Sequence, residues 1–265
     1  MMARPHVSVA TICFDGFGDK DFVPAFTYAP ELGIHEIEFN AWYPRNLTPA
    51  GLESIRRRCD EAGLRPVTLH VSGFAPGPER EDLSREAQRW MWLFEAADRL
   101  GVHVVKATGS DRGSRGGLDA TISLLRVIAP VAEERGMTIA LENHAGNVLE
   151  HPEDYRTVFA QVDSAAVGMC FDTGHFAASG HDLVAVAKEF AGRIVQVDLK
   201  DCKGPGPGAF VRFGEGSVNF DAVLREIMSG DCAVGHILVE FPLAERATMM
   251  ADLRAGAAIA HRFGD

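Results

Sequence analysis

The chain has 265 residues, of which 46% are hydrophobic and 24% are charged. This composition is typical of globular domains and excludes the fibrous and disordered classes. The formal net charge of -11 argues against nucleic acid as a partner, because affinity for DNA or RNA comes largely from cations that neutralise phosphates.

Short runs rich in Val, Ile and Leu alternate with longer stretches of helical period along the whole chain. This alternation is typical of repeated β/α units around a parallel sheet. Eight such units within the length of one domain predict closure into a barrel, so we expect a single (β/α)₈ TIM-barrel domain over residues 1–265. The predicted strands are Val7–Cys13, Glu36–Asn40, Arg65–Val71, His103–Ala107, Thr138–Glu142, Val167–Asp172, Ile194–Leu199 and Ile237–Phe241.

Helices are predicted between these strands, and most are followed by a glycine that can end a helix in the left-handed conformation. The predicted helices are Leu52–Ala62, Arg85–Leu100, Ala120–Arg135, Asp182–Phe190 and Asp221–Met228. The expected terminating glycines are Gly63, Gly101, Gly136, Gly192 and Gly230.

The cysteines and the apolar segments bear on where the protein resides. The five cysteines are widely spaced and form no CxxC pair, which indicates a reducing, cytoplasmic environment. We find no secretion signal near the start and no apolar stretch of the roughly 18 residues that a transmembrane helix requires. We therefore expect a cytoplasmic protein with no membrane partner. A homo-oligomer is compatible with the sequence.

Four acidic residues stand at the carboxyl ends of the last four predicted strands: Glu142, Asp172, Asp198 and Glu240. Side chains alternate along a strand, and adjacent strands lie about 4.8 Å apart, so these four carboxylates are expected to converge at one end of the barrel. Converging carboxylates repel one another unless a bound cation neutralises them. A hard divalent cation takes several oxygen ligands, and we therefore predict a metal site formed by these four residues.

The second half of the chain resembles the xylose-isomerase-like TIM-barrel superfamily of sugar phosphate isomerases and epimerases. The blocks that carry the resemblance are IALENHAG (139–146), CFDTGHFAASGHD (170–182), RIVQVDLKD (193–201), FGEGSVNF (213–220) and ILVEFP (237–242). The superfamily also includes ketose 3-epimerases, inositol-catabolism enzymes, hydroxypyruvate isomerases, 3-dehydroshikimate dehydratases and AP endonucleases. The first half of the chain matches only in the rhythm of its strands and helices.

The resemblance implies a ligand set of Glu, Asp, His and Glu after the last four strands. Glu142, Asp172 and Glu240 match it directly. Where relatives read HxHxKD, this chain has Gln196 and Asp198 in place of the two histidines. Aspartate ligates through oxygen, so the substitution favours one Mn²⁺ or Mg²⁺ ion over metals that prefer imidazole. A weakened or vacant site is the alternative.

Several further side chains are predicted to contact substrate. His175 matches the DxxH motif, whose histidine touches substrate in the relatives. The other candidates stand at strand ends or in the loops that follow them, where barrel enzymes bind their ligands. These substrate-binding candidates are His70, Lys106, Arg212, Glu38, Asn143 and His144.

The resemblance implies a reaction that begins by removing a proton from carbon next to a carbonyl group. The metal is expected to chelate the carbonyl and its neighbouring hydroxyl, and so to stabilise the enediolate, while Glu142 and Glu240 exchange protons as base and acid. The predicted function is therefore isomerisation or epimerisation of a small sugar or sugar-like hydroxy-ketone.

Two alternatives remain open at the level of the sequence. A dehydratase or lyase acting on a 3-oxo polyol or a 3-dehydroshikimate-like compound begins with the same proton abstraction and then expels a hydroxyl group. A non-catalytic, sugar-binding barrel needs no tightly bound ion. An endonuclease is disfavoured, because the histidines needed for several zinc ions are absent after the seventh predicted strand and the net charge is negative.

Overall fold

Eight parallel strands form a closed barrel at the centre of the protein. The computed structural model describes residues 4–206, 209–229, 233–241 and 246–265. The strands follow one another around the barrel in the order β1, β10, β7, β6, β5, β4, β3, β2, which confirms the predicted (β/α)₈ fold. They are β1 (His6–Ala10), β2 (Glu36–Asn40), β3 (Arg65–His70), β4 (Val104–Thr108), β5 (Thr138–Glu142), β6 (Val167–Asp172), β7 (Ile194–Leu199) and β10 (His236–Val239).

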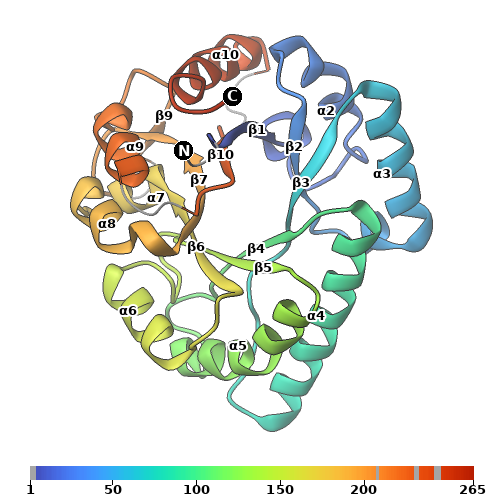
Figure 1. The fold of residues 1–265 in the computed structure, drawn as a ribbon, viewed down its shortest axis with the longest axis vertical. Coiled ribbons are helices and arrows are strands. Elements are labelled where there is room, and N and C mark those ends of the chain that lie inside the picture. Colours follow the sequence, from blue (N-terminus) through green and yellow to red (C-terminus); the bar gives the residue numbers. More distant parts are fainter. Residues whose placement is uncertain (1–3, 207–208, 230–232, 242–245) are drawn as a thin grey trace.

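Helices surround the barrel as an outer layer, and Figure 1 shows them forming a ring around the strands. The α-helices are α1 (Ile12–Asp15), α2 (Val23–Tyr28), α3 (Pro49–Ala62), α4 (Arg80–Leu100), α5 (Gly117–Glu134), α6 (Pro152–Gln161), α7 (Thr173–Ala178), α8 (Leu183–Phe190), α9 (Phe220–Ser229) and α10 (Met249–Ala260). Shorter elements are the 3₁₀ helices η1 (Pro30–Leu32), η2 (Pro44–Leu47) and η3 (Ala191–Arg193), and the two-stranded hairpin of β8 (Asp201–Cys202) and β9 (Phe210–Val211).

The ends of α3 show how local sequence sets an element's bounds. The Thr48 side chain accepts a hydrogen bond from the backbone N–H of Gly51 at 3.1 Å, and Pro49 occupies the first helical position, where no N–H is needed. Gly63 ends the helix with a φ of 65°, a conformation that costs glycine least. The helix therefore starts three residues before the predicted Leu52 and ends at the predicted residue.

Other predicted boundaries differ from the structure. The first strand ends at Ala10, because the side chain of Asn40 accepts a hydrogen bond from the N–H of Ile12 and the chain turns there into α1. The predicted strand Val7–Cys13 was therefore too long. Asp182 caps α8 from outside the helix, and Gly192 lies within η3 rather than after a left-handed turn. Gly230 lies outside the described residues.

The interior of the barrel carries a polar layer. Thr68 donates a hydrogen bond to Gln196 at 2.8 Å, and Gln196 donates to Glu38 at 3.0 Å and to Asp198 at 2.8 Å. The Lys106 ammonium group lies 2.8 Å from Glu38 and 2.5 Å from Asp198. These five residues, which we call the interior network, come from β2, β3, β4 and β7 and are almost fully buried. Barrel interiors are more often filled by branched apolar side chains.

Two further observations concern the predicted environment. Among the described residues, no helix combines the length and the apolar character needed to cross a membrane. Cys13, Cys59, Cys170 and Cys202 are buried and unpaired by disulfides, while Cys232 lies outside the described part of the chain.

Candidate active site

The four acidic residues predicted from the strand ends lie together at one end of the barrel. Glu142 and Asp172 are the last residues of β5 and β6, Asp198 is the fifth residue of β7, and Glu240 directly follows β10. Each offers a carboxylate oxygen, and these four oxygens all lie within 4.8 Å of one another. All four side chains are buried. We call these residues the carboxylate cluster.

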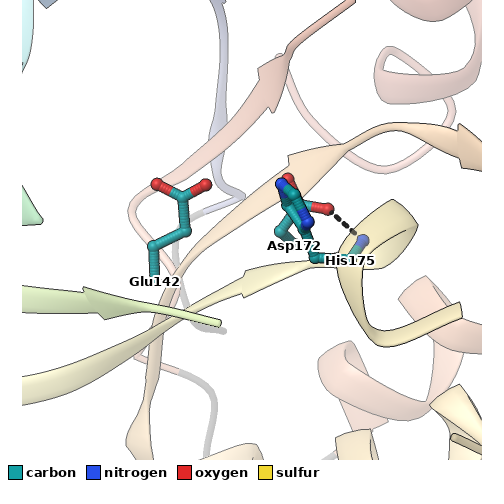
Figure 2. Close-up of side chains that lie close together, drawn as sticks. All are labelled: Glu142, Asp172 and His175. Atoms are coloured by element: carbon teal, nitrogen blue, oxygen red, sulfur yellow. Dashed lines mark hydrogen bonds between the residues drawn. The ribbon is translucent and has the colours of Figure 1, made fainter. Parts of the chain in front are cut away.

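Figure 2 shows Glu142 and Asp172 on neighbouring strands, with the ring of His175 beside Asp172. The side chain of Asp172 accepts a hydrogen bond from the backbone N–H of His175 at 2.8 Å and so caps α7. Asn143 holds the backbone of Asp172 from the other side: its Oδ1 accepts from the Asp172 N–H at 2.7 Å, and its Nδ2 donates to the Asp172 carbonyl at 2.9 Å. The orientation of Asp172 is therefore fixed by Asn143, which follows β5, and by the first turn of α7.

Two buried lysines stand among these carboxylates. Lys106 Nζ lies 3.6 Å from Glu142 and 3.5 Å from Glu240, in addition to its closer contacts within the interior network. Lys200 Nζ lies 2.9 Å from Asp172 and 2.8 Å from Glu240. Two ammonium groups thus offset part of the charge of five carboxylates, those of the cluster and of Glu38. A negative excess remains if all five are ionised.

The carboxyl groups of the cluster differ in pKa, because burial and the two lysines act on them to different extents. Burial raises the pKa of Glu142 to about 7, with Lys106 and His70 acting in the opposite direction. Burial also raises the pKa of Asp198 to about 7, again against the pull of Lys106. Burial opposes ionisation of Glu240 too, but Lys200 and Lys106 outweigh it and hold the pKa of that carboxyl well below its ordinary value. Environments that separate the pKa values of neighbouring carboxyls are typical of acid–base sites.

Three oxygens of the carboxylate cluster lack a hydrogen bond within the described chain. They are Glu142 Oε2, Asp172 Oδ2 and Glu240 Oε2. Lys200 lies 2.9 Å from the Asp172 oxygen, but the contact is not aligned as a hydrogen bond. Buried polar atoms in folded proteins rarely lack a hydrogen-bond partner. Three such atoms in one cluster therefore point to a water molecule or an ion as their partner. A set of oxygen donors with a negative excess fits a hard divalent cation.

His70 links the cluster to the interior network. Asn40 Nδ2 donates to His70 Nδ1 at 2.8 Å, which places the proton of the neutral imidazole on Nε2. His70 Nε2 in turn lies 3.4 Å from Glu142 Oε2. Asn40 thus fixes the orientation of the His70 ring, so that Nε2 points toward the carboxylate of Glu142.

Two further histidines, His144 and His175, lie beside the cluster. The rings of His144 and His175 lie 3.9 Å apart, and the backbone N–H of Ala145 donates to His175 Nδ1 at 3.3 Å. Burial lowers the pKa of both rings, that of His175 well below its ordinary value, and Lys200 adds to the effect. Both imidazoles are therefore neutral near pH 7 and can donate or accept hydrogen bonds without adding charge.

A cavity of about 840 Å³ opens above the carboxylate cluster, within the size range of small-molecule sites. Five predicted site residues line it: Glu142, Glu240, His70, His144 and His175. Lys200 and the aromatic residues Phe17, Trp42, Phe74 and Phe210 line it as well. Asp172 and Asp198 lie in the cluster but do not line the cavity, so Glu142 and Glu240 are the members of the cluster that can meet a ligand directly.

The other predicted substrate contacts lie elsewhere. Lys106 and Glu38 are fully buried in the interior network, and Asn143 is fully buried against the backbone of Asp172. Arg212 pairs with Asp252 of α10 at 2.6 Å. The residues that line the cavity do not include these four, and their contact with substrate stays a prediction.

Sequence reasoning missed Lys200 and the aromatic wall. Lys200 lies two residues after Asp198 at the end of β7, so strand alternation places it on the same side as that aspartate, a usable signal. Trp42 and Phe17 stack with ring centroids 3.8 Å apart, although they come from the loops after β2 and β1. The local sequence around each residue gives no signal that these two aromatic side chains will stack.

Part of the chain is similar in sequence to a curated enzyme. The chain is 27% identical over 132 residues to the inosose dehydratase of Clostridium perfringens, a match that covers 44% of this chain and 44% of that enzyme. The chain thus matches less than half of the length of this curated relative.

Solved structures resemble the whole barrel at low sequence identity. A D-psicose 3-epimerase determined in the presence of D-fructose has a TM-score of 0.80 at 14% identity, with coverage of 97% of this chain and 99% of that one. The IOLI protein with a bound zinc atom has a TM-score of 0.79 at 17% identity and the same coverage. These likenesses show the fold. Over residues 26–259 the sequence matches the family described as the xylose isomerase-like TIM barrel, and because that match spans most of the chain, the protein belongs to this family.

Proposed function

We propose that the protein is a divalent-metal-dependent isomerase or epimerase of a small sugar or sugar-like hydroxy-ketone. The observation that carries the proposal is the carboxylate cluster, in which four buried acidic side chains each offer an oxygen within 4.8 Å of the others and two of them, Glu142 and Glu240, line a cavity. Burying several like charges together is costly, and a site that maintains them needs a function that uses them. Membership of the family and the likeness to an epimerase fold support this reading.

The residues that would hold the cation belong to the carboxylate cluster. Glu142, Asp172 and Glu240 contribute the three unsatisfied oxygens, and Asp198 is the fourth member of the predicted set. When bound, a divalent cation supplies positive charge against the negative charge that develops on a carbonyl oxygen during proton abstraction. The all-oxygen donor set favours Mn²⁺ or Mg²⁺.

Proton transfer is assigned to Glu142 and Glu240, the two carboxyl groups of the cluster that line the cavity. Glu240 is kept ionised by Lys200 and Lys106, so it suits the role of base. Glu142 is the other carboxyl group of the cluster at the cavity, and it is assigned the role of acid. The base takes the proton from carbon, the C–H electron pair forms a carbon–carbon double bond, and the carbonyl electron pair moves to oxygen.

The position of the returning proton decides the product. Return to the same carbon from the opposite face gives the epimer, and return to the neighbouring carbon gives the aldose or ketose isomer. The rings of His70, His144 and His175 line the cavity around these two carboxyls and are placed to hydrogen-bond the hydroxyl groups of a sugar-like substrate.

Dehydration is the second candidate, favoured by the similarity to inosose dehydratase. It begins with the same proton abstraction, after which the electron pair expels a hydroxyl group from the next carbon and a proton converts it to water. Elimination leaves a carbon–carbon double bond conjugated to the carbonyl, which absorbs ultraviolet light. Isomerisation and epimerisation create no such chromophore, so the products separate the two reactions.

The test is incubation of the purified protein with Mn²⁺ and a panel of small ketoses and cyclic keto-polyols in D₂O. Proton NMR is expected to show loss of the C–H signal next to the carbonyl as deuterium enters, together with a new epimer or isomer. Glu142→Gln is expected to lower the rate by roughly 100-fold or more. Glu95→Gln, on the exposed surface of α4, is the matched control and should leave the rate unchanged.

Two outcomes contradict the proposal. If Glu142→Gln turns over the true substrate at the wild-type rate, the assigned roles are wrong. If the folded, Mn²⁺-loaded protein binds sugars but exchanges no carbon-bound proton across the panel, the protein is a sugar-binding barrel rather than an enzyme.

A further inference from the structure

Gln196 and Asp198 of β7 stand where the relatives are expected to carry histidines, and both belong to the interior network. Gln196 donates hydrogen bonds to Glu38 on β2 and to Asp198, and it accepts one from Thr68 on β3. Asp198 faces Lys106 on β4. The two departures from the family pattern are therefore hydrogen-bonded to each other, and Asp198 is also the ion-pair partner of the buried Lys106.

The two oxygens of Asp198 both have close partners. Oδ1 accepts a hydrogen bond from Gln196 Nε2 at 2.8 Å, and Oδ2 accepts one from Lys106 Nζ at 2.5 Å. In Glu142, Asp172 and Glu240, by contrast, one oxygen each makes no aligned hydrogen bond within the described chain. Asp198 therefore differs from the other members of the carboxylate cluster in having its hydrogen-bonding capacity already engaged.

Lys106 needs this carboxylate. Its ammonium group is fully buried, and a buried cation requires close counter-charges. Its two nearest acidic partners are Asp198 at 2.5 Å and Glu38 at 2.8 Å, while Glu142 and Glu240 are at 3.5 Å or more. A histidine at position 198 would be neutral and would leave Lys106 with one close counter-charge instead of two.

We propose that Asp198 is the counter-ion of Lys106 and lies outside the ligand set, so that Glu142, Asp172 and Glu240 alone hold the divalent cation. This inference rests on the metal site of the proposed function. An ammonium group 2.5 Å from Asp198 Oδ2, hydrogen-bonded to it, repels a divalent cation bound at that oxygen. Glu142 Oε2 and Glu240 Oε2 lie 3.6 and 3.5 Å from Lys106, and the 2.9 Å contact between Lys200 and Asp172 Oδ2 is longer and is not aligned as a hydrogen bond. Catalytic metal sites commonly keep one coordination position open for substrate, and a site with three protein ligands leaves such a position.

The test is titration of the full-length, metal-stripped protein with Mn²⁺, followed by the electron paramagnetic resonance signal of the free ion. The double variant Lys106→Met/Asp198→Asn removes one positive and one negative charge, so the net charge of the site is unchanged. We expect it to bind one Mn²⁺ with an affinity within about threefold of the wild type. Asp172→Asn, the same chemical change at a proposed ligand, is expected to weaken binding by roughly 100-fold or more.

If the double variant loses Mn²⁺ as Asp172→Asn does while remaining folded by circular dichroism, Asp198 is a ligand and the inference is wrong. If the folded wild type itself binds no Mn²⁺, the metal site of the proposed function fails, and the assignment of three ligands fails with it.

A second measurement tests the ion pair without any metal. Thermal denaturation in EDTA is expected to show that Lys106→Met alone melts at a lower temperature than the wild type, because Glu38 and Asp198 then face each other without their shared cation. Adding Asp198→Asn to this variant should raise the melting temperature again. A further decrease on adding Asp198→Asn would show that Asp198 does not serve as the counter-ion.

Discussion

His70 Nε2 lies 3.4 Å from Glu142 Oε2, and Asn40 orients the ring from behind through His70 Nδ1. The imidazole thus presents a proton to the one carboxyl group of the cavity whose pKa is raised to about 7. A donor in this place favours the ionised form of Glu142 and so works against burial. His70 is therefore a positioning and tuning residue for that carboxyl.

His70→Leu is expected to lower kcat by roughly 10- to 100-fold, as is usual when a hydrogen-bonded supporting residue is lost. Because the variant removes a group that stabilises ionised Glu142, the limb of the pH–rate profile that reports this carboxyl should move to higher pH. Steady-state rates between about pH 5 and pH 9 measure the shift. A lower kcat with an unchanged profile would mean that His70 has a structural role only.

Mn²⁺ is expected to raise the melting temperature of the wild-type protein above its value in EDTA. A ligand that binds only the folded state stabilises it by about 2.7 kcal/mol at 100 times its dissociation constant. Glu240→Gln, which removes a proposed ligand, should abolish this rise, whereas Glu95→Gln should retain it. An equal rise in Glu240→Gln would place the ion elsewhere.

Trp42→Ala is expected to raise KM by roughly 2- to 10-fold with little change in kcat. Trp42 lines the cavity, is 37% exposed and stacks on Phe17, so it offers a flat apolar face to the C–H groups of a sugar ring. Trp92→Ala on the outer surface of α4 is a matched control, because its side chain is 38% exposed and does not line the cavity. Equal effects of the two substitutions would contradict this role.

At the amino-terminal end of the barrel, Glu36 is predicted to contribute stability that depends on pH. His236 Nδ1 lies 3.0 Å from Glu36, His6 lies 3.5 Å away, and Arg65 forms an ion pair with it. Burial opposes ionisation of Glu36, but His236 and Arg65 outweigh it and lower its pKa below the ordinary value of 4.5. The stabilisation is therefore present above pH 4.5 and is lost as the pH falls through the lowered value.

Glu36→Gln should consequently reduce the free energy of unfolding by about 1–3 kcal/mol at pH 7 and by less at about pH 3. Urea denaturation at the two pH values measures the difference. Glu53→Gln, at an exposed position of α3, is the control and should change little at either pH. A Glu36→Gln effect that is the same at both pH values would show that ionised Glu36 is not the source.

The meeting of the four acidic residues was predictable from the sequence, because each ends an apolar run and parallel strands of a barrel end at the same rim. The positions of Lys106 and Lys200 relative to them were not. The alternation of side chains along a strand places Lys106 on the inner face of β4. Which residues of the other strands it contacts across the barrel depends on the tilt and stagger of the strands. Sequence spacing carries no such information.

The start of the chain shows the same limit. Thr11, Ile12 and Cys13 continue an apolar run, and local pattern alone extends the strand through them. The turn into α1 depends on the side chain of Asn40, which lies 28 residues further along the chain than Ile12. Tertiary hydrogen bonds of this kind override local preference.

The interior network joins Glu38 to Gln196, residues separated by 158 positions in the chain. Half-barrels cut between β4 and β5 would each keep only some of these groups: one fragment would carry Glu38, Thr68 and Lys106, and the other Gln196 and Asp198. The second fragment would have to bury Asp198 without Lys106, and the first would keep the Glu38–Lys106 ion pair but lose the second counter-charge of Lys106 and the amide of Gln196. Charge pairing across the lumen thus makes the two halves mutually dependent for folding, so that neither is expected to form a stable unit by itself.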